Sequence, residues 1–121
     1  KVEDFGIGFY TKYGDGGVDI SPIADLLKSQ VFELGNYLNL PKEILSATPT
    51  DGLWDDNRND EDQIGATYSE IEWAMNQVSN ETNSILNNRE KEVIDLYNNL
   101  NLKNKHKMIP IPICKIPKDF L

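Results

Sequence analysis

The chain has 121 residues, 20 of them acidic and 12 basic, and its net charge of −8 argues against a protein that coats nucleic acid. The single cysteine, Cys114, excludes a scaffold held together by intrachain disulfides. No apolar run approaches the ~20 residues of a membrane-spanning helix. The sequence therefore predicts one small domain, or part of a larger one, with no nucleic-acid or membrane partner.

The charge is divided unevenly along the chain. Residues 101–121 hold five lysines and one acidic residue, so the preceding hundred residues carry all of the negative excess. A basic segment behind an acidic body is typical of a tail that folds back or of one that meets an anion.

Residues 5–20 contain five of the eight glycines, interleaved with aromatic side chains. This composition predicts a loop, with a short strand over residues 7–10 and tight turns over residues 14–17. A glycine-rich loop with Lys12 and nearby carboxylates offers what a phosphate or nucleotide site needs, although it matches neither standard phosphate-binding motif. A turn-rich connection with a surface lysine stays open as the alternative.

Ser21 followed by Pro22 is typical of a helix N-cap with proline in the first turn, and it predicts a helix over residues 21–38. Asn39 and Pro41 predict its end. Apolar residues recur there at spacings of three and four and predict one buried stripe, made of Ile23, Leu26, Leu27, Val31, Leu34 and Leu38.

The downstream sequence predicts further helices. Short ones are expected over residues 41–45 and 60–64, and the capping box of Thr67 with Glu70 opens another. A last helix is predicted over residues 88–100, with Val93, Leu96, Tyr97 and Leu100 on one face. Residues 108–120 hold three prolines and are predicted to be extended.

Residues 46–63 predict an irregular acidic loop. Asp55, Asn57 and Asn59 match the first ligands of a calcium-binding loop. The required Gly and Glu are replaced by Asp60 and Ala66, so a calcium site is excluded. A mobile, solvated loop of this length is typical of a lid.

His106 stands between two lysines, and with no Cys or second His nearby it predicts no zinc site. His106 and its neighbouring lysines allow two interpretations, a solvated basic stretch or a site that binds an anion.

Several blocks of the sequence together resemble the C-terminal half of the bacterial NAD synthetases. They occur in that family's order and with similar spacing over residues 4–107: residues 8–19, residues 22–28, residues 49–53, Asp60-Glu61, residues 65–68 with Ile71, and His106-Lys107.

This resemblance implies an α/β, Rossmann-like fold, that of the adenine nucleotide alpha hydrolases (N-type ATP pyrophosphatases), of which this chain would be the mostly helical C-terminal part. It also implies a ligase that amidates deamido-NAD to NAD⁺. ATP adenylates the nicotinate carboxylate and releases pyrophosphate, and ammonia then displaces AMP. Adenylation is needed because a carboxylate is a poor electrophile, and Mg²⁺ offsets the phosphate charge. A cytoplasmic homodimer is implied as well.

The resemblance assigns binding residues and no catalytic residue. For deamido-NAD they are Lys12, Asp19, His106 and Lys107; for ATP, Lys28 and Thr50; for Mg²⁺, Asp4 with Glu3 as the alternative. Two positions depart from the family pattern, since Asp4 replaces a Glu and Met108 follows where an Arg is common.

The family's pyrophosphate-binding Ser-Gly-Gly-x-Asp-Ser loop does not occur in this sequence, whose one Gly-Gly pair, Gly16-Gly17, lacks the flanking residues. We therefore expect residues 1–121 to be the C-terminal segment of a single NAD synthetase domain, inactive alone. The alternatives are a non-catalytic acidic helical interaction module and another amide-forming ATP pyrophosphatase. Whether ammonia or glutamine supplies the nitrogen stays open.

Overall fold

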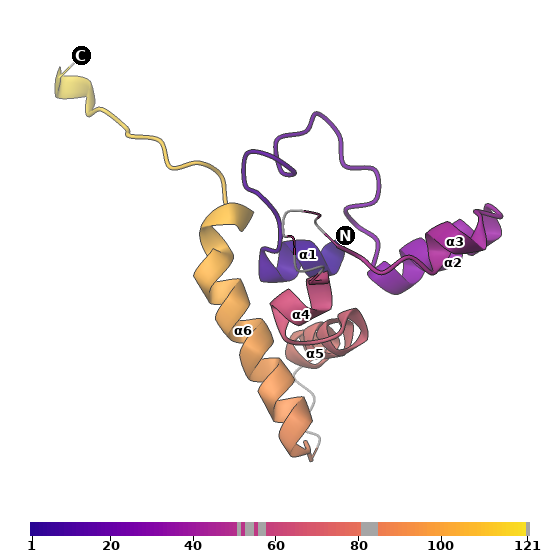
Figure 1. Ribbon diagram of the computed structural model, residues 1–121. Coiled ribbons are helices and arrows are strands. Elements are labelled where there is room, and N and C mark those ends of the chain that lie inside the picture. Colours follow the sequence, from indigo (N-terminus) through magenta and orange to yellow (C-terminus); the bar gives the residue numbers. More distant parts are fainter. Residues whose placement is uncertain (51, 53–54, 56–57, 81–84, 121) are drawn as a thin grey trace.

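The computed structural model describes residues 1–50, 52, 55, 58–80 and 85–120 of the chain. All regular structure in these residues is helical, in the order α1 (Val2–Ile7), α2 (Lys28–Tyr37), α3 (Lys42–Leu45), α4 (Asp60–Ile64), α5 (Tyr68–Asn80), α6 (Asn88–Met108) and the 3-10 turn η1 (Lys118–Phe120). Helix α6 runs along one side of α1, α4 and α5, whereas α2 with α3 and the C-terminal tail project from this body (Figure 1).

The hydrophobic core lies where α1, α5 and α6 meet. Ile7, Ile71 and Val93 supply one nearly inaccessible side chain from each helix, and burial of such a side chain contributes about 1.5–3 kcal/mol. Leu96, Tyr97 and Leu100 pack against them, which confirms the predicted apolar face of the last helix.

The predicted strand over residues 7–10 is wrong, because the chain there leaves a helix. Helix α1 ends at Gly8, whose backbone is left-handed at φ 68°. A Cβ at this position would lie 2.3 Å from the Cβ of Asn104 on α6. Gly8 is therefore required both for its backbone conformation and for the close approach of α6.

A row of side chains on α6 satisfies the carbonyl groups at the end of α1. The Asn101 amide donates to the Gly6 carbonyl at 2.6 Å, and the Asn104 amide donates to the Ile7 carbonyl at 2.8 Å. The next member, Lys107, donates to the carbonyls of Gly8 and Tyr10. A three-residue spacing keeps these donors on one face of the helix, so α6 caps α1 from the side.

These contacts explain why α6 is longer than predicted. The sequence predicts an end near residue 100 because the apolar period stops there, yet the helix continues to Met108. Asn101, Asn104 and Lys107 pack as donors instead of as apolar groups. The helix ends before Pro110, which forces Ile109 into an extended conformation.

The predicted start of the helix over residues 21–38 is also wrong. Residues 22–25 form turns, and α2 begins at Lys28. Two hydrogen bonds with α1 keep the helix from starting before Lys28. The Val2 amide donates to the Leu26 carbonyl, and the Lys28 amide donates to the Glu3 carboxylate at 2.6 Å. Glu3 therefore caps α2 from 25 residues away, in place of Ser21.

The buried stripe predicted for this helix is not buried in this structure. Ile23, Leu34 and Leu38 are exposed, and only Gly35 of α2 is buried. The physical reason is that α2 packs mainly on the short helix α3, away from the core (Figure 1).

Other predicted elements are confirmed. Helices α3 and α4 lie where they were expected, and the tight turns of the glycine-rich loop are present. The capping box is formed, because the Glu70 carboxylate accepts from the Thr67 amide at 2.8 Å. Part of the acidic loop, residues 51, 53–54 and 56–57, lies outside the described residues, so its role as a lid stays a prediction.

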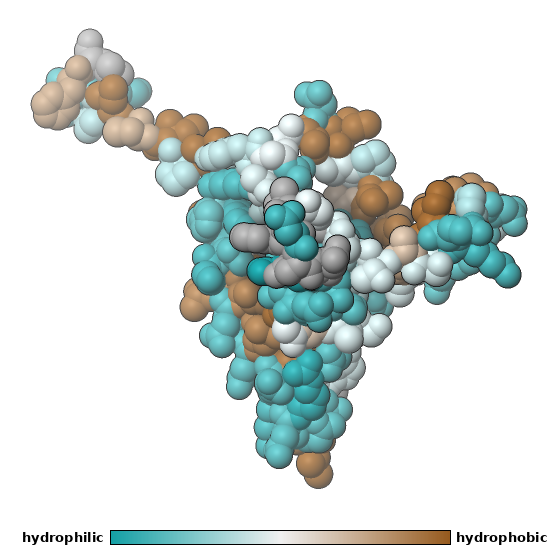
Figure 2. Space-filling model, viewed as in Figure 1, coloured by the Kyte–Doolittle hydropathy of each residue, from teal (hydrophilic) through white to brown (hydrophobic). Residues whose placement is uncertain are grey.

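The tail is extended, as predicted, up to the short turn η1. It stands away from the body with exposed side chains, including Cys114, and much of its surface is hydrophobic (Figure 2). None of the helices in the described part of the chain is both long and apolar enough to cross a membrane.

We expect the substitution Gly8→Ala to destabilise the chain more than Gly65→Ala. Both glycines end a helix in the left-handed region, so each substitution costs about 1–2 kcal/mol of backbone strain. Only at Gly8 does the added methyl clash, since the nearest atom at Gly65 is 3.8 Å away. Urea unfolding measures the difference, and equal losses would contradict the close contact between Gly8 and α6.

The ion pair between Glu70 and Arg89 predicts a pH dependence of stability. The hydrogen bonds from Arg89 and then from the Thr67 amide lower the pKa of Glu70 from 4.5 to about 2. Glu70 therefore contributes stability fully above pH 4.5 and loses this contribution as the pH falls toward 2. The variant Glu70→Gln should be less stable than the parent at pH 7 and nearly equal to it at pH 2. An unfolding deficit that does not change with pH would contradict this.

Candidate functional site

A hollow of about 430 Å³ lies between α1, the glycine-rich loop and the last turn of α6. Its lining brings together two lysines and one carboxylate that the resemblance assigns to binding, Lys12, Lys107 and Asp4. Tyr10 and Phe5 supply an aromatic wall, with their rings stacked at a centroid distance of 6.0 Å. The hollow can therefore accept an anionic ligand that carries a flat ring.

The glycine-rich loop is folded by hydrogen bonds within itself. The Thr11 carbonyl accepts from the amides of Gly14 and Gly16, and the Asp15 carboxylate accepts from the Thr11 amide at 3.0 Å. A Cβ at Gly16 would lie 2.6 Å from the Lys12 carbonyl oxygen, so the turn is too tight for a side chain there. The turn presents Lys12 to the hollow.

Lys12 is the cation in this hollow that the fold leaves available. Its ammonium lies 5.5 Å from the centre of the Tyr13 ring. Within the part of the chain that the structure describes, no carboxylate forms an ion pair with it. A half-buried cation without an anionic partner is suited to an anionic ligand.

Lys107 has a different environment. Its ammonium donates to the carbonyls of Gly8 at 2.7 Å and Tyr10 at 2.8 Å, while the Tyr10 hydroxyl donates to the Lys107 carbonyl at 2.6 Å. Burial raises the pKa of Tyr10, so that this hydroxyl keeps its proton. Two of the three ammonium donors thus hold the loop, and one remains for a ligand.

Asp4 fits a role as a Mg²⁺ ligand better than Glu3 does. Mg²⁺ is commonly held by one or two carboxylates together with substrate phosphates. Asp4 lines the hollow and pairs with Lys1 at 2.7 Å, whereas Glu3 is fully buried, outside that lining, and caps α2. Among the described residues, no cluster of three or more His, Cys, Asp or Glu side chains could hold a metal. A Mg²⁺ ion at Asp4 would therefore also need oxygen atoms from the bound substrate.

Lys28 lies in a second hollow, of about 210 Å³, next to the first. The lining includes Tyr68 and Pro49, and Tyr68 also donates to Asp4 of the first hollow at 3.1 Å. Desolvation, followed by repulsion from Lys1, lowers the pKa of Lys28. Lys12 and Lys28 therefore occupy neighbouring hollows that share the Asp4–Tyr68 wall.

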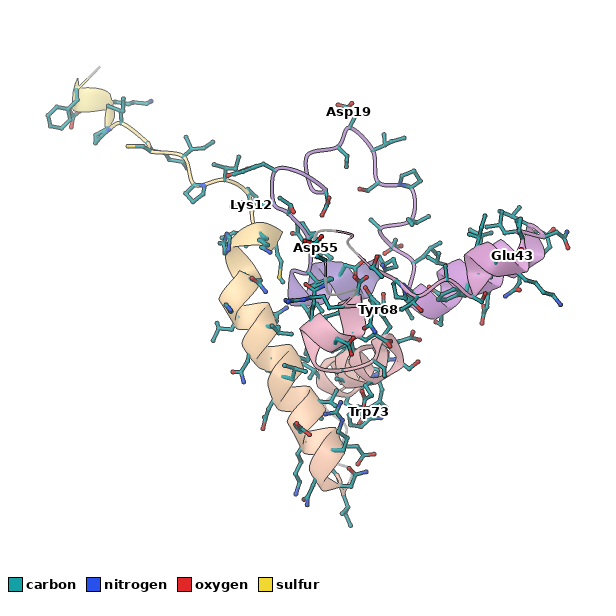
Figure 3. All side chains as sticks on the ribbon, in the orientation of Figure 1. Lys12, Asp19, Glu43, Asp55, Tyr68 and Trp73 are labelled. Carbon is teal, nitrogen blue, oxygen red and sulfur yellow. The ribbon has the colours of Figure 1, made fainter. Side chains whose placement is uncertain are left out.

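Besides Glu3, three of the predicted binding residues do not line either hollow. Asp19 lies at the outer tip of the glycine-rich loop, while Lys12 lies near the end of α6 (Figure 3). His106 is exposed on the last turn of α6, and Thr50 is exposed next to Pro49. Their assignment to ligands rests on the resemblance alone and stays a prediction.

Sequence reasoning missed two residues of the site, Tyr10 and Tyr68. Tyr10 is part of the aromatic wall, and Tyr68 joins the two hollows. Tyr68 belongs to the block of residues 65–68 that carries the resemblance, but no role was predicted for it. Its partners Asp4 and Asp60 lie 64 and 8 residues away, so local sequence carries no signal of them.

Comparisons with known proteins identify the family of this chain. The model of the NAD synthase family matches residues 1–110. The NH(3)-dependent NAD(+) synthetase of Picrophilus torridus is 38% identical over 95% of this chain and 42% of its own length. The enzymes of the same name from Carboxydothermus hydrogenoformans and Methanococcoides burtonii are 36% and 46% identical over 84% and 60% of this chain, and 37% and 27% of their own lengths.

This chain spans less than half the length of each of these relatives. The family match nevertheless covers nearly all of the 121 residues, including the glycine-rich loop and the residues that line both hollows. The chain therefore belongs to the NAD synthase family.

Proposed function

We propose that this chain supplies the deamido-NAD side of an NAD synthetase, which converts deamido-NAD, ATP and ammonia to NAD⁺, AMP and pyrophosphate. The observation that carries the proposal is the hollow in which Lys12, Lys107 and Asp4 converge beside the Tyr10 ring. A dinucleotide needs cations for its phosphates and flat apolar surface for its rings, and this hollow offers both. The names of the relatives support the same reaction and the use of free ammonia.

The proposed roles follow from what each side chain can reach. Lys12, which forms no ion pair with any carboxylate among the described residues, would neutralise the dinucleotide phosphates, with the free donor of Lys107 as a second contact. Asp19 and His106 would approach the substrate from the rims of the loop and of α6. Asp4 would hold Mg²⁺, whose role when bound is to offset negative charge on the phosphates.

Lys28 and Thr50 would contact ATP on the other side of the Asp4–Tyr68 wall. The two substrates must meet there, because the nicotinate carboxylate attacks the α-phosphate of ATP and pyrophosphate leaves. Neighbouring hollows that share one wall support such an approach. A residue that transfers protons is not required for this step, since the nucleophile is already an anion.

The wider setting is part of the proposal. We propose that residues 1–121 form the C-terminal part of an α/β domain of the adenine nucleotide alpha hydrolase fold, in a cytoplasmic homodimer. This chain covers less than half the length of its relatives, which supports its being part of a larger domain. So does the exposure of large apolar side chains on α2 and at its end, namely Phe32, Leu34 and Leu38, which the described residues leave partly uncovered. The chain alone is expected to bind ligand without turnover, because it has no pyrophosphate loop.

We expect Lys12→Ala to weaken the binding of deamido-NAD to the 121-residue chain by roughly 10- to 150-fold, because a charge-assisted contact contributes about 1.5–3 kcal/mol. Lys28→Ala should leave deamido-NAD binding nearly unchanged and weaken ATP binding instead. Calorimetric titration of each variant with each ligand measures both effects.

The matched control is Lys105→Ala, which removes an exposed lysine from α6 outside both hollows. It should bind both ligands as the parent does. If all three variants lost affinity equally for each ligand, only the net charge of the chain would matter, and the assignment of the two hollows would be wrong. Binding of neither ligand by the parent at millimolar concentration would favour the helical interaction module.

A further inference from the structure

Tyr68 occupies an unusual position for a core residue. It is the first residue of α5 and only 5% exposed, and it contacts charged groups of three other segments. Its hydroxyl reaches α1 and α4, and its ring faces the start of α2. Figure 3 shows it at the centre of the body, between these elements.

The hydroxyl joins two carboxylates. The Tyr68 oxygen lies 3.1 Å from Asp4 Oδ1 and 3.1 Å from Asp60 Oδ2. Both carboxylates can only accept, and a phenol has a single proton to donate. The hydroxyl therefore donates to one carboxylate at a time or shares its proton between the two, and Asp4 of the first hollow meets Asp60 of α4 at this hydroxyl.

Two lysine ammonium groups lie over the Tyr68 ring. The Lys28 ammonium lies 4.2 Å from the ring centre, and the Lys1 ammonium lies 4.9 Å from it. Lys1 is also paired with Asp4 at 2.7 Å, which leaves Lys28 as the cation held chiefly by the ring. A cation this close to an aromatic face is attracted by the ring's charge distribution.

Lys28 is consequently fixed at both ends. Glu3 accepts from its backbone amide at 2.6 Å, and Tyr68 holds its ammonium. The Phe32 ring, at 5.5 Å, is a more distant neighbour on the same helix. Without the Tyr68 ring, the four-carbon side chain would be free to turn toward solvent.

We propose that Tyr68 is a positioning residue, whose ring aims Lys28 into its hollow and whose hydroxyl sets Asp4 against Asp60 at the wall between the two hollows. The assignment of Lys28 to ATP rests on the proposed function, whereas the aim of Lys28 by the ring does not. The ring and the hydroxyl have separate tasks, so two substitutions separate them. Tyr68→Phe keeps the ring, and Tyr68→Leu removes both groups.

The experiment follows the Lys28 side-chain methylene signals by NMR in the 121-residue chain. The ring shifts protons above its face upfield, so the parent and Tyr68→Phe should share an upfield Lys28 signal that Tyr68→Leu loses. Tyr37→Leu, which removes a tyrosine that is 82% exposed on α2, is the matched control and should keep it. An ordinary Lys28 shift in the parent, or one that Tyr68→Leu leaves in place, overturns the proposal.

The hydroxyl has its own readout, which also applies if Tyr68→Leu fails to fold. In Tyr68→Phe the carboxyl carbon signals of Asp4 and Asp60 should move, and in Tyr97→Phe, which removes a half-buried hydroxyl elsewhere, they should not. Unmoved carboxyl signals in Tyr68→Phe overturn the task assigned to the hydroxyl.

Titration with ATP separates this inference from the proposed function. Tyr68→Leu should bind ATP about tenfold more weakly than the parent, and Tyr68→Phe should lose less, because its ring still holds Lys28. If the parent binds no ATP while the Lys28 signal follows the ring, the proposed ATP site fails and the positioning role stands. If the parent binds ATP and both Tyr68 variants bind it as tightly as the parent does, the positioning role fails.

Discussion

The structure depends on the hydrogen bonds that side chains of α6 donate to the carbonyl groups at the end of α1. A helix of six residues is too short to be stable alone, and its last carbonyls need partners. Asn101, Asn104 and Lys107 supply them from a neighbouring helix about a hundred residues later in the chain. The left-handed Gly8 and the start of the glycine-rich loop are fixed by the same contacts, so the hollow that holds Lys12 owes its shape to α6.

The candidate site has a simple electrostatic plan. Cations face two hollows, Lys12 with Lys107 in one and Lys28 in the other, and the wall between them is built from Asp4 and Tyr68. Burial and the nearby carboxylates hold the pKa of Tyr68 far above its usual range, so its hydroxyl stays a neutral donor. The neutral Tyr68 ring in this wall can hold the Lys28 ammonium without cancelling its charge, which a carboxylate in the same place could not do.

Local sequence predicted those elements that local forces decide. The capping box of Thr67 and the apolar face around Val93 are set within one or two helical turns, and both are present. The start of α2 and the length of α6 were missed because Glu3 and Asn104 act across the fold. For the site, the structure gathers three of the residues that the resemblance assigned, Lys12, Lys107 and Asp4, in one hollow. The role of Tyr68 was not predicted, because it depends on partners in other segments of the chain.

The central claim is that this hollow receives the dinucleotide, and titration of the ¹⁵N-labelled chain with deamido-NAD tests it most directly. We expect the largest amide shifts on the glycine-rich loop around Lys12 and on the last turn of α6 around Lys107. Shifts concentrated on α2 and α3, or on the extended tail, would place the ligand elsewhere and contradict it.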